Sequence, residues 1–146
     1  RNGMRSGKEP QMLTLEKVKN ELAQYHYRYA DNVVCGHTKS KIKWVIPAGS
    51  ASVLVFEQAT SYLFGFEYQG IHLFPVEGDW KIAEHLFLPW EEVTDFKMKG
   101  GLLENDMKIQ TSNMQISMKI NKVVANNPWV KENIENLKAS NYYYRK

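Results

Sequence analysis

Residues 95–121 alternate apolar and polar side chains with a period of two, interrupted only by short turn sequences. The apolar members are Phe96, Met98, Met107, Ile109, Met114, Ile116, Met118 and Ile120. Successive side chains of a β-strand point to opposite faces of a sheet, so this pattern gathers the apolar side chains on one face and the polar ones on the other. It predicts antiparallel strands with one dry face and one solvated face.

Helical spacing of apolar residues occurs only near the two ends of the chain. It predicts a helix over residues 14–30, capped by Thr14, and a second helix that begins at Pro128 behind Asn127. Between them, β-branched and aromatic segments separated by turn residues predict further strands. The sequence therefore predicts an α+β, mostly β fold: a curled antiparallel sheet or barrel of about seven strands, with a C-terminal capping helix and an extra N-terminal helix.

The 146 residues suffice for one domain with a substantial core. We expect residues 1–12 to be an expression tag or a flexible segment and residues 13–31 to hold the N-terminal helix. Residues 32–140 should form the main domain, including the C-terminal helix, and residues 141–146 a tail.

Net charge separates the ends of the chain from its body. The chain carries a formal charge of +3, but residues 1–12 and residues 141–146 contribute +2 each, which leaves −1 for residues 13–140. A nucleic-acid-binding domain usually carries its positive charge on the folded surface, so nucleic acid is not a predicted partner. The alternating aromatic residues over 61–68 would otherwise suit base stacking; core or interface packing is the better interpretation.

The single cysteine, Cys35, excludes an internal disulfide and suits a reducing cytoplasm. We expect a cytoplasmic protein that associates with membranes at most peripherally, because no apolar stretch approaches the roughly 18 residues of a membrane span. Gly100-Gly101 lacks the Lys-Ser/Thr of a phosphate loop, and zinc-ligand spacing does not occur. No cofactor and no metal are predicted.

Four segments together resemble the bacterial pleckstrin-homology-like domains, including GRAM-like and YokE-like domains. They are ATSYLFGFEYQGIHLFPV (59–76), FLPWEEVTDFKMKGGLL (87–103), MKIQTSNMQISMKI (107–120) and NNPWVKENIENL (126–137). The resemblance covers roughly residues 33–138 and implies a seven-stranded barrel plugged by the last helix. It implies no single ligand, because such domains bind lipids, proteins or peptides, or self-associate, and a fold does not fix a function.

Glu91 and Glu92 follow Pro89-Trp90 and could be an acid/base pair or only the beginning of a strand. General acid/base pairs need two carboxyl groups that face one substrate across a cleft. Neighbours on a strand point to opposite faces, so we expect a solvated strand start with Trp90 packed inward.

Cys35 and His37 are two residues apart and would share one face of a strand. A thiolate–imidazole pair or half of a metal site would have this spacing. His26, His72 and His85 are scattered along the chain, although folding could gather some of them. The alternative is a buried thiol beside a surface imidazole, and we predict no catalytic residue.

Lys39, Lys41 and Lys43 are the candidate site for an anion or a lipid headgroup. On a strand they would share a face, as ammonium groups that match a phosphate cluster should, but a solvated strand face has the same spacing. In the lipid-binding domains of the resembled family, basic residues near the first hairpin hold phosphates. Lys97 and Lys99 form a second, weaker basic face.

Five aromatic residues are candidates for interaction with a partner: Trp90, Trp129, Tyr142, Tyr143 and Tyr144. The tyrosine-rich tail could lie at a membrane interface, fray, or pack back on the barrel. We predict a non-catalytic binding or adaptor module that contacts a protein partner or a second copy through a sheet edge or the groove beside the C-terminal helix. The alternatives are peripheral association with anionic lipid headgroups and a small Cys/His enzyme.

Overall fold

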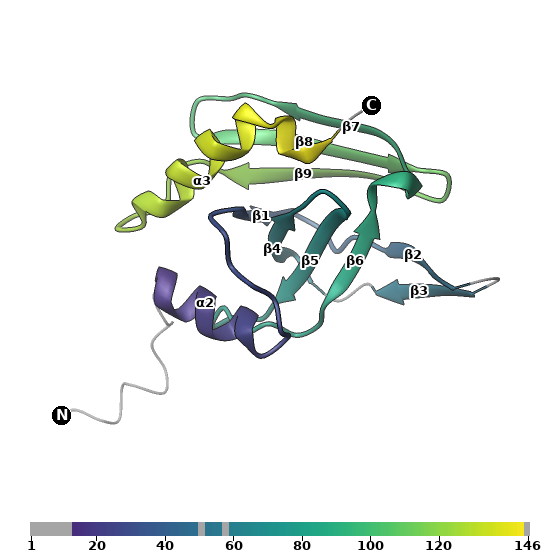
Figure 1. Cartoon of the computed structure of the whole chain (residues 1–146), viewed down its shortest axis with the longest axis horizontal. Coiled ribbons are helices and arrows are strands. Elements are labelled where there is room, and N and C mark those ends of the chain that lie inside the picture. The colour runs from purple at the N-terminus through teal and green to yellow at the C-terminus, as the bar shows by residue number, and fades with distance from the viewer. Residues whose placement is uncertain (1–12, 50–51, 57–58, 145–146) are drawn as a thin grey trace.

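In the part of the chain that the structure describes, a helix, nine strands and a second helix follow one another, and Figure 1 shows their arrangement. The computed structural model describes residues 13–49, 52–56 and 59–144. The elements are α2 (Leu15–Ala23), β1 (Val33–His37), β2 (Trp44–Gly49), β3 (Ser52–Phe56), β4 (Ser61–Phe66), β5 (Gly70–Val76), β6 (Leu86–Pro89), the 3-10 turn η1 (Trp90–Glu92), β7 (Val93–Lys99), β8 (Glu104–Thr111), β9 (Gln115–Asn121), α3 (Pro128–Ala139) and the 3-10 turn η2 (Asn141–Tyr143). The expected N-terminal tag or flexible segment, residues 1–12, and the tail cations Arg145 and Lys146 lie outside the described residues.

Seven of the strands form one antiparallel sheet in the order β6-β5-β4-β1-β9-β8-β7. Strands β4, β5 and β6 form one meander and strands β7, β8 and β9 another, and β1 joins the two by pairing with β4 and with β9. The remaining two strands, β2 and β3, form a separate hairpin, which lies between β1 and β4 in the chain order. The predicted mostly β fold with a terminal helix at each end is confirmed.

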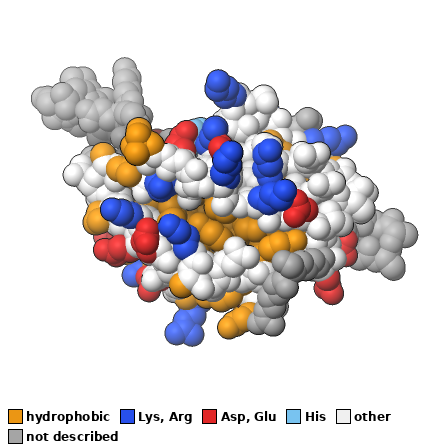
Figure 2. All heavy atoms as spheres, turned by 90° about the horizontal axis from the view of Figure 1, so that it is seen from above, with side chains coloured by type: hydrophobic (Ala, Val, Ile, Leu, Met, Phe, Trp, Pro, Cys, Tyr) orange, Lys and Arg blue, Asp and Glu red, His pale blue; other side chains and the backbone are white. Residues whose placement is uncertain are grey.

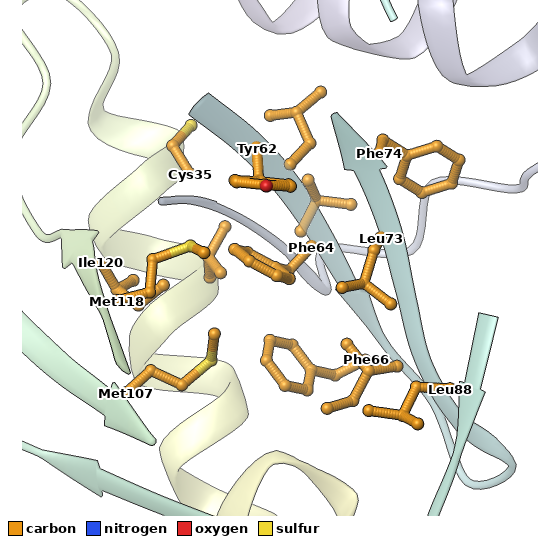
Figure 3. Close-up of a cluster of buried hydrophobic side chains, with 14 of the residues drawn as sticks. Cys35, Tyr62, Phe64, Phe66, Leu73, Phe74, Leu88, Met107, Met118 and Ile120 are labelled. Carbon is orange, nitrogen blue, oxygen red and sulfur yellow. The ribbon is translucent and has the colours of Figure 1, made fainter. Parts of the chain in front are cut away.

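The sheet curls so that its two halves face each other across a shared core. Phe66 of β4 and Phe96 of β7 belong to opposite halves, yet their ring centroids lie 6.0 Å apart. Figure 3 shows Phe64 and Phe66 pointing toward Met107 and Met118, and all four side chains are buried. The register explains the alternation in the sequence, because Met107 pairs with Met118 and both face inward.

The N-terminal helix is shorter than predicted, because α2 ends at Ala23 instead of near residue 30. His26 adopts a left-handed conformation (φ 59°), while the Tyr27 amide donates to Leu22 O and the His26 amide donates to Ala23 O. This pair of bonds is a Schellman arrangement, which closes a helix once a residue enters the left-handed region. The predicted N-cap is confirmed, since the Thr14 hydroxyl accepts a first-turn amide at 3.1 Å.

The segment after α2 covers the outer face of β4 and β5. The Tyr27 ring packs on His72 and on Phe74, at centroid distances of 4.8 and 5.2 Å. A Cβ atom on Gly65 would lie 2.1 Å from the Tyr27 hydroxyl oxygen, so only a glycine leaves room for this ring. The buried Asn32 side chain holds the segment in place by donating to the Tyr27 hydroxyl and to Phe66 O, both at 2.9 Å.

The Pro-Trp-Glu-Glu segment differs from the prediction. Glu91 and Glu92 lie in the 3-10 turn η1 between the two edge strands of the sheet, not at the beginning of a strand. Pro89 ends β6, and the chain turns before β7 begins at Val93. Trp90 packs inward as predicted.

The C-terminal helix α3 begins at Pro128 with Asn127 at the N-cap, as predicted. The Asn127 side chain is directed at an indole instead of a helix amide, because its Oδ1 accepts from Trp129 Nε1 at 2.8 Å. In the middle of α3 the buried Asn133 donates to Val33 O of β1 at 3.0 Å. This bond fixes the helix against the centre of the sheet.

Candidate functional site

A groove of about 570 Å³ lies over the outer face of β7, β8 and β9 and reaches the end of β1. Five lysines line it: Lys39, Lys97, Lys99, Lys108 and Lys119. We call this hollow the basic groove. Figure 2, which looks down on the molecule from above, shows Lys and Arg side chains (blue) gathered around a strip of hydrophobic side chains (orange) on this face of the molecule.

The strand register assembles these lysines from four parts of the chain. Lys97 of β7 pairs with Lys108 of β8, so their outward side chains are neighbours. One pleat further along, Lys99 pairs with Asp106, which in turn pairs with Lys119 of β9. Like charges placed directly opposite one another destabilise a sheet, so Lys97 and Lys108 form an arrangement that folding alone does not favour.

Two of the residues that line the basic groove are carboxylates, which reduce its positive charge. Asp106 forms an ion pair with Lys119; their hydrogen bond lowers the pKa of the Asp106 carboxyl and raises that of the Lys119 ammonium. Glu104 Oε2 lies 3.0 Å from His37 Nε2. Five lysines against two carboxylates leave a net charge of three positive when His37 is neutral. Lys39, Lys97, Lys99 and Lys108 are exposed, so their charges remain accessible to a ligand.

The structure regroups the predicted lysines. Lys39 lines the basic groove together with Lys97 and Lys99, but Lys41 and Lys43 are not among its lining residues. The prediction that Lys39, Lys41 and Lys43 share a strand face is wrong, because β2 begins only at Trp44 and the three lysines lie in the preceding loop. The two lysines of β8 and β9 were missed as site residues.

The signal for the missed pair, Lys108 and Lys119, is present in the sequence. Both occupy outward positions of strands that alternate cleanly. Lys108 comes opposite Lys97 in the β7–β8 register, and Lys119 comes opposite Asp106 in the β8–β9 register. Fixing these two registers from the apolar positions would have predicted the clustering, because a one-residue slip would move every side chain to the other face.

Both tryptophans predicted for interaction are buried. Trp90 Nε1 donates to Glu67 O at 2.8 Å, and the indole lies against Phe96 at a centroid distance of 5.3 Å. Trp129 packs on Tyr29 with its Nε1 bonded to Asn127. Neither side chain offers the exposed indole surface that the predicted partner contact requires.

The tyrosine tail packs back on the barrel, which was one of the three predicted possibilities. Tyr142 is buried against Phe66, at a centroid distance of 5.2 Å, and burial raises its pKa to about 12. Tyr143 and Tyr144 are half-buried, and Tyr144 lies 5.2 Å from the Trp90 ring. These three side chains therefore belong mainly to the core and its margin.

Cys35 and His37 are not arranged as a thiolate–imidazole pair. Cys35 is buried on β1, and desolvation raises the pKa of its thiol to about 12. His37 is half-buried, with Nδ1 3.2 Å from Asn121 Oδ1 and Nε2 close to Glu104. A protonated thiol is a weak nucleophile and a poor metal ligand.

Folding brings two of the scattered histidines together. His72 Nδ1 and His85 Nε2 lie 2.9 Å apart, and His72 Nε2 faces the Glu67 carboxylate. Among the described residues, no group of three or more His, Cys, Asp or Glu side chains is arranged to hold a metal ion. The three residues form a hydrogen-bonded chain beneath the N-terminal segment.

A comparison of the chain with protein-family models, with curated proteins and with solved structures finds no match. Neither of the helices in the described part of the chain is long and apolar enough to cross a membrane. The proposals below therefore rest on the geometry of the described residues.

Proposed function

We propose that this protein is a non-catalytic binding module of pleckstrin-homology-like architecture, and that its ligand is an anion held in the basic groove. One observation carries the proposal: five lysines from four separate segments converge on one hollow, although residues 13–140 as a whole carry a net charge of −1. Charge gathered in this way raises the local concentration of an oppositely charged ligand.

The arrangement of strands supports the architectural part of the proposal. Two antiparallel meanders joined by β1, followed by a C-terminal helix against the central strand, match the layout that the sequence resemblance implies. The β2–β3 hairpin and α2 are additions to this layout. Function is argued from the site alone, because one fold serves many functions.

The chemistry of the basic groove favours phosphate or carboxylate groups. Lysine ammonium groups on flexible stems present three donors each and act as point charges toward phosphate. The volume of about 570 Å³ is that of a site for a small molecule or a headgroup. Asp106 pairs with Lys119 and Asp95 lies 3.8 Å from Lys97, but the lysines that line the groove outnumber its carboxylates, so the field of the groove is positive.

The predicted adaptor contact through a sheet edge receives less support. The edge strand β7 carries Asp95, Lys97 and Lys99, and its register shifts between Val93 and Asp95. Charged side chains and irregular register are the features that prevent an edge strand from pairing with another chain. A protein partner would more readily present an acidic segment to the basic groove than add a strand.

Calorimetric titration with tripolyphosphate at low salt tests the proposal. We expect saturable binding that weakens by at least about tenfold in the Lys99→Gln/Lys108→Gln variant, because both exposed side chains line the basic groove. The matched control is Lys41→Gln/Lys43→Gln, which removes two exposed lysines that are not among the lining residues of the groove. Equal losses in the two variants, or no binding by the unmodified protein, would overturn the proposal.

A further inference from the structure

Residues 24–32, which we call the strap, join α2 to β1 and form neither helix nor strand. The strap lies over the outer face of β4 and β5, where the Tyr27 ring packs on Phe74. Its end is anchored at Asn32, whose backbone carbonyl accepts from the Phe66 amide at 3.1 Å. The strap is therefore held by individual contacts instead of the ladder of backbone hydrogen bonds that holds a strand.

A pair of imidazoles lies beneath the strap. The Tyr27 ring covers His72, whose side chain is only 17% exposed, and the Tyr25 ring lies 6.1 Å from the ring of His85. His72 Nδ1 faces His85 Nε2 at 2.9 Å, while the Glu67 carboxylate faces His72 Nε2. The seating of both tyrosine rings therefore depends on where the two imidazoles lie.

This pair of imidazoles accommodates one added proton but not two. A protonated His72 donates from Nε2 to Glu67 and from Nδ1 to a neutral His85 that carries its own proton on Nδ1, so the pair stays bonded. With two added protons, both of the facing nitrogens are donors, and two positive charges meet across a hydrogen-bond distance. The imidazoles must then separate and take up water, which the rings above them prevent while the strap is in place.

Two carboxylates and two tyrosine hydroxyls surround the pair. Glu67 faces His72 and also acts on His85, and Glu84 is the second acidic neighbour of His85. The tyrosine hydroxyls of the strap are neutral at acid pH. Burial is the largest cause of the shift at both imidazoles and lowers each pKa below the ordinary 6.5, although the carboxylates act in the opposite direction. Desolvation by the strap and its surroundings therefore outweighs the attraction of the carboxylates.

We propose that the strap is an acid-released cover: when His72 and His85 both carry an added proton, residues 24–32 leave the outer face of β4 and β5 while the barrel stays folded. Separation of the two imidazoles removes the support of both tyrosine rings of the strap. Release uncovers the aromatic ring of Phe74, which is buried beneath the same two tyrosines at centroid distances of 6.3 and 5.2 Å.

The opening is local because the strap and the barrel core lie on opposite faces of the same strands. Leu73 precedes Phe74 on β5 and points into the core beside Phe64, as Figure 3 shows. Helix α2 keeps its own attachment, since Val18 and Leu22 are buried. A segment that is held by few contacts opens at a lower free-energy cost than the whole domain.

Hydrogen exchange of the full chain, followed by mass spectrometry at about pH 7.5 and at about pH 5, tests this proposal. Protection factors are compared, because they are corrected for the effect of pH on the chemical exchange rate. We expect the protection of residues 24–32 to fall by at least about tenfold at the lower pH, while peptides from β8 and β9 keep their protection. Equal protection of the strap at the two pH values, or a parallel fall in β8 and β9, would overturn the proposal.

The variant His85→Gln removes the second added proton, and His37→Gln is the matched control. In His85→Gln we expect the protection of the strap to change by less than about threefold between the two pH values, because only one imidazole can charge and Glu67 faces it. His37 lies on β1 beside Glu104, so its replacement should leave the acid release unchanged. Undiminished release in His85→Gln, or loss of release in His37→Gln, would show that the imidazole pair does not control the strap.

Discussion

His72 Nδ1 lies 2.9 Å from His85 Nε2, and His72 Nε2 faces the Glu67 carboxylate. When both imidazoles are neutral, His72 donates from Nε2 to Glu67 and accepts on Nδ1 the Nε2 proton of His85, so the three groups form one chain of hydrogen bonds. Tyr27 packs on His72 and Tyr25 on His85, with centroid distances of 4.8 and 6.1 Å. The two histidines therefore support the docking of the N-terminal segment.

Acidification should destabilise the protein through this pair. Burial, the largest cause in each case, lowers the pKa of both His72 and His85 below the ordinary 6.5. As the pH falls, the unfolded chain therefore binds protons at a higher pH than the native state does. The contribution of the pair to the free energy of unfolding is complete above about pH 6.5 and is lost as the pH falls below that value. Urea unfolding should show a lower midpoint at about pH 5.5 than at about pH 7.5.

The double variant His72→Gln/His85→Gln isolates this effect from the other titrating groups. Because glutamine does not titrate, the variant should be less stable at neutral pH but lose less stability on acidification than the unmodified protein. If the urea midpoint falls between the two pH values by the same amount in the variant as in the unmodified protein, the pair does not sense pH.

Gly65→Ala should displace the N-terminal segment. The added methyl would meet the Tyr27 hydroxyl oxygen at 2.1 Å, and the ring cannot retreat without leaving His72 and Phe74. Overpacking of this kind costs about 1–3 kcal/mol of unfolding free energy. The matched control is Gly78→Ala in an exposed turn, where a Cβ atom would meet nothing within 4 Å. Equal urea midpoints for the two variants would contradict the packing described here.

The sheet was predictable from the sequence because each strand from residue 95 to residue 121 alternates apolar and polar side chains. A polar residue facing inward would be costly, so the alternation alone fixes which side chains face the core. The helix after Thr14 was overextended because Tyr25 and Tyr29 continue the helical spacing. Tyr25 packs instead from the turn that ends α2, and Tyr29 packs from the segment that follows the left-handed residue His26.

The basic groove depends on information that alternation does not contain. Lys108 and Lys119 each looked like an ordinary solvated position, and only the pairing between strands places Lys108 beside Lys97 and Lys119 beside Asp106. Likewise, the burial of Tyr142 depends on a turn in which three successive residues, 141–143, have positive φ. Residue propensities do not predict such a turn, because the left-handed region is unfavourable for the two tyrosines that follow Asn141.

Tyr142→Ala should destabilise the barrel although it lies near the end of the chain. The side chain is buried among aromatic rings, with Phe66 and Phe96 at centroid distances of 5.2 and 5.9 Å. Truncation of a large buried ring costs about 3–5 kcal/mol, to be measured as a shift of the urea midpoint. Tyr68→Ala is the control at an exposed position, and its cost should stay below about 1 kcal/mol. Similar costs for the two would mean that the tail does not pack as described.

Cys35 should resist alkylation while the protein is folded. Thiolate is the reactive species, and burial raises the pKa of this thiol to about 12, so almost none forms at about pH 8. Iodoacetamide should therefore modify Cys35 rapidly in urea and only as fast as the protein unfolds in buffer, as followed by mass spectrometry. Gly65→Ala, if it loosens the segment over β4, should speed the modification in buffer. Rapid labelling of the unmodified native protein would show an accessible thiolate and would restore the Cys35 enzyme as a candidate.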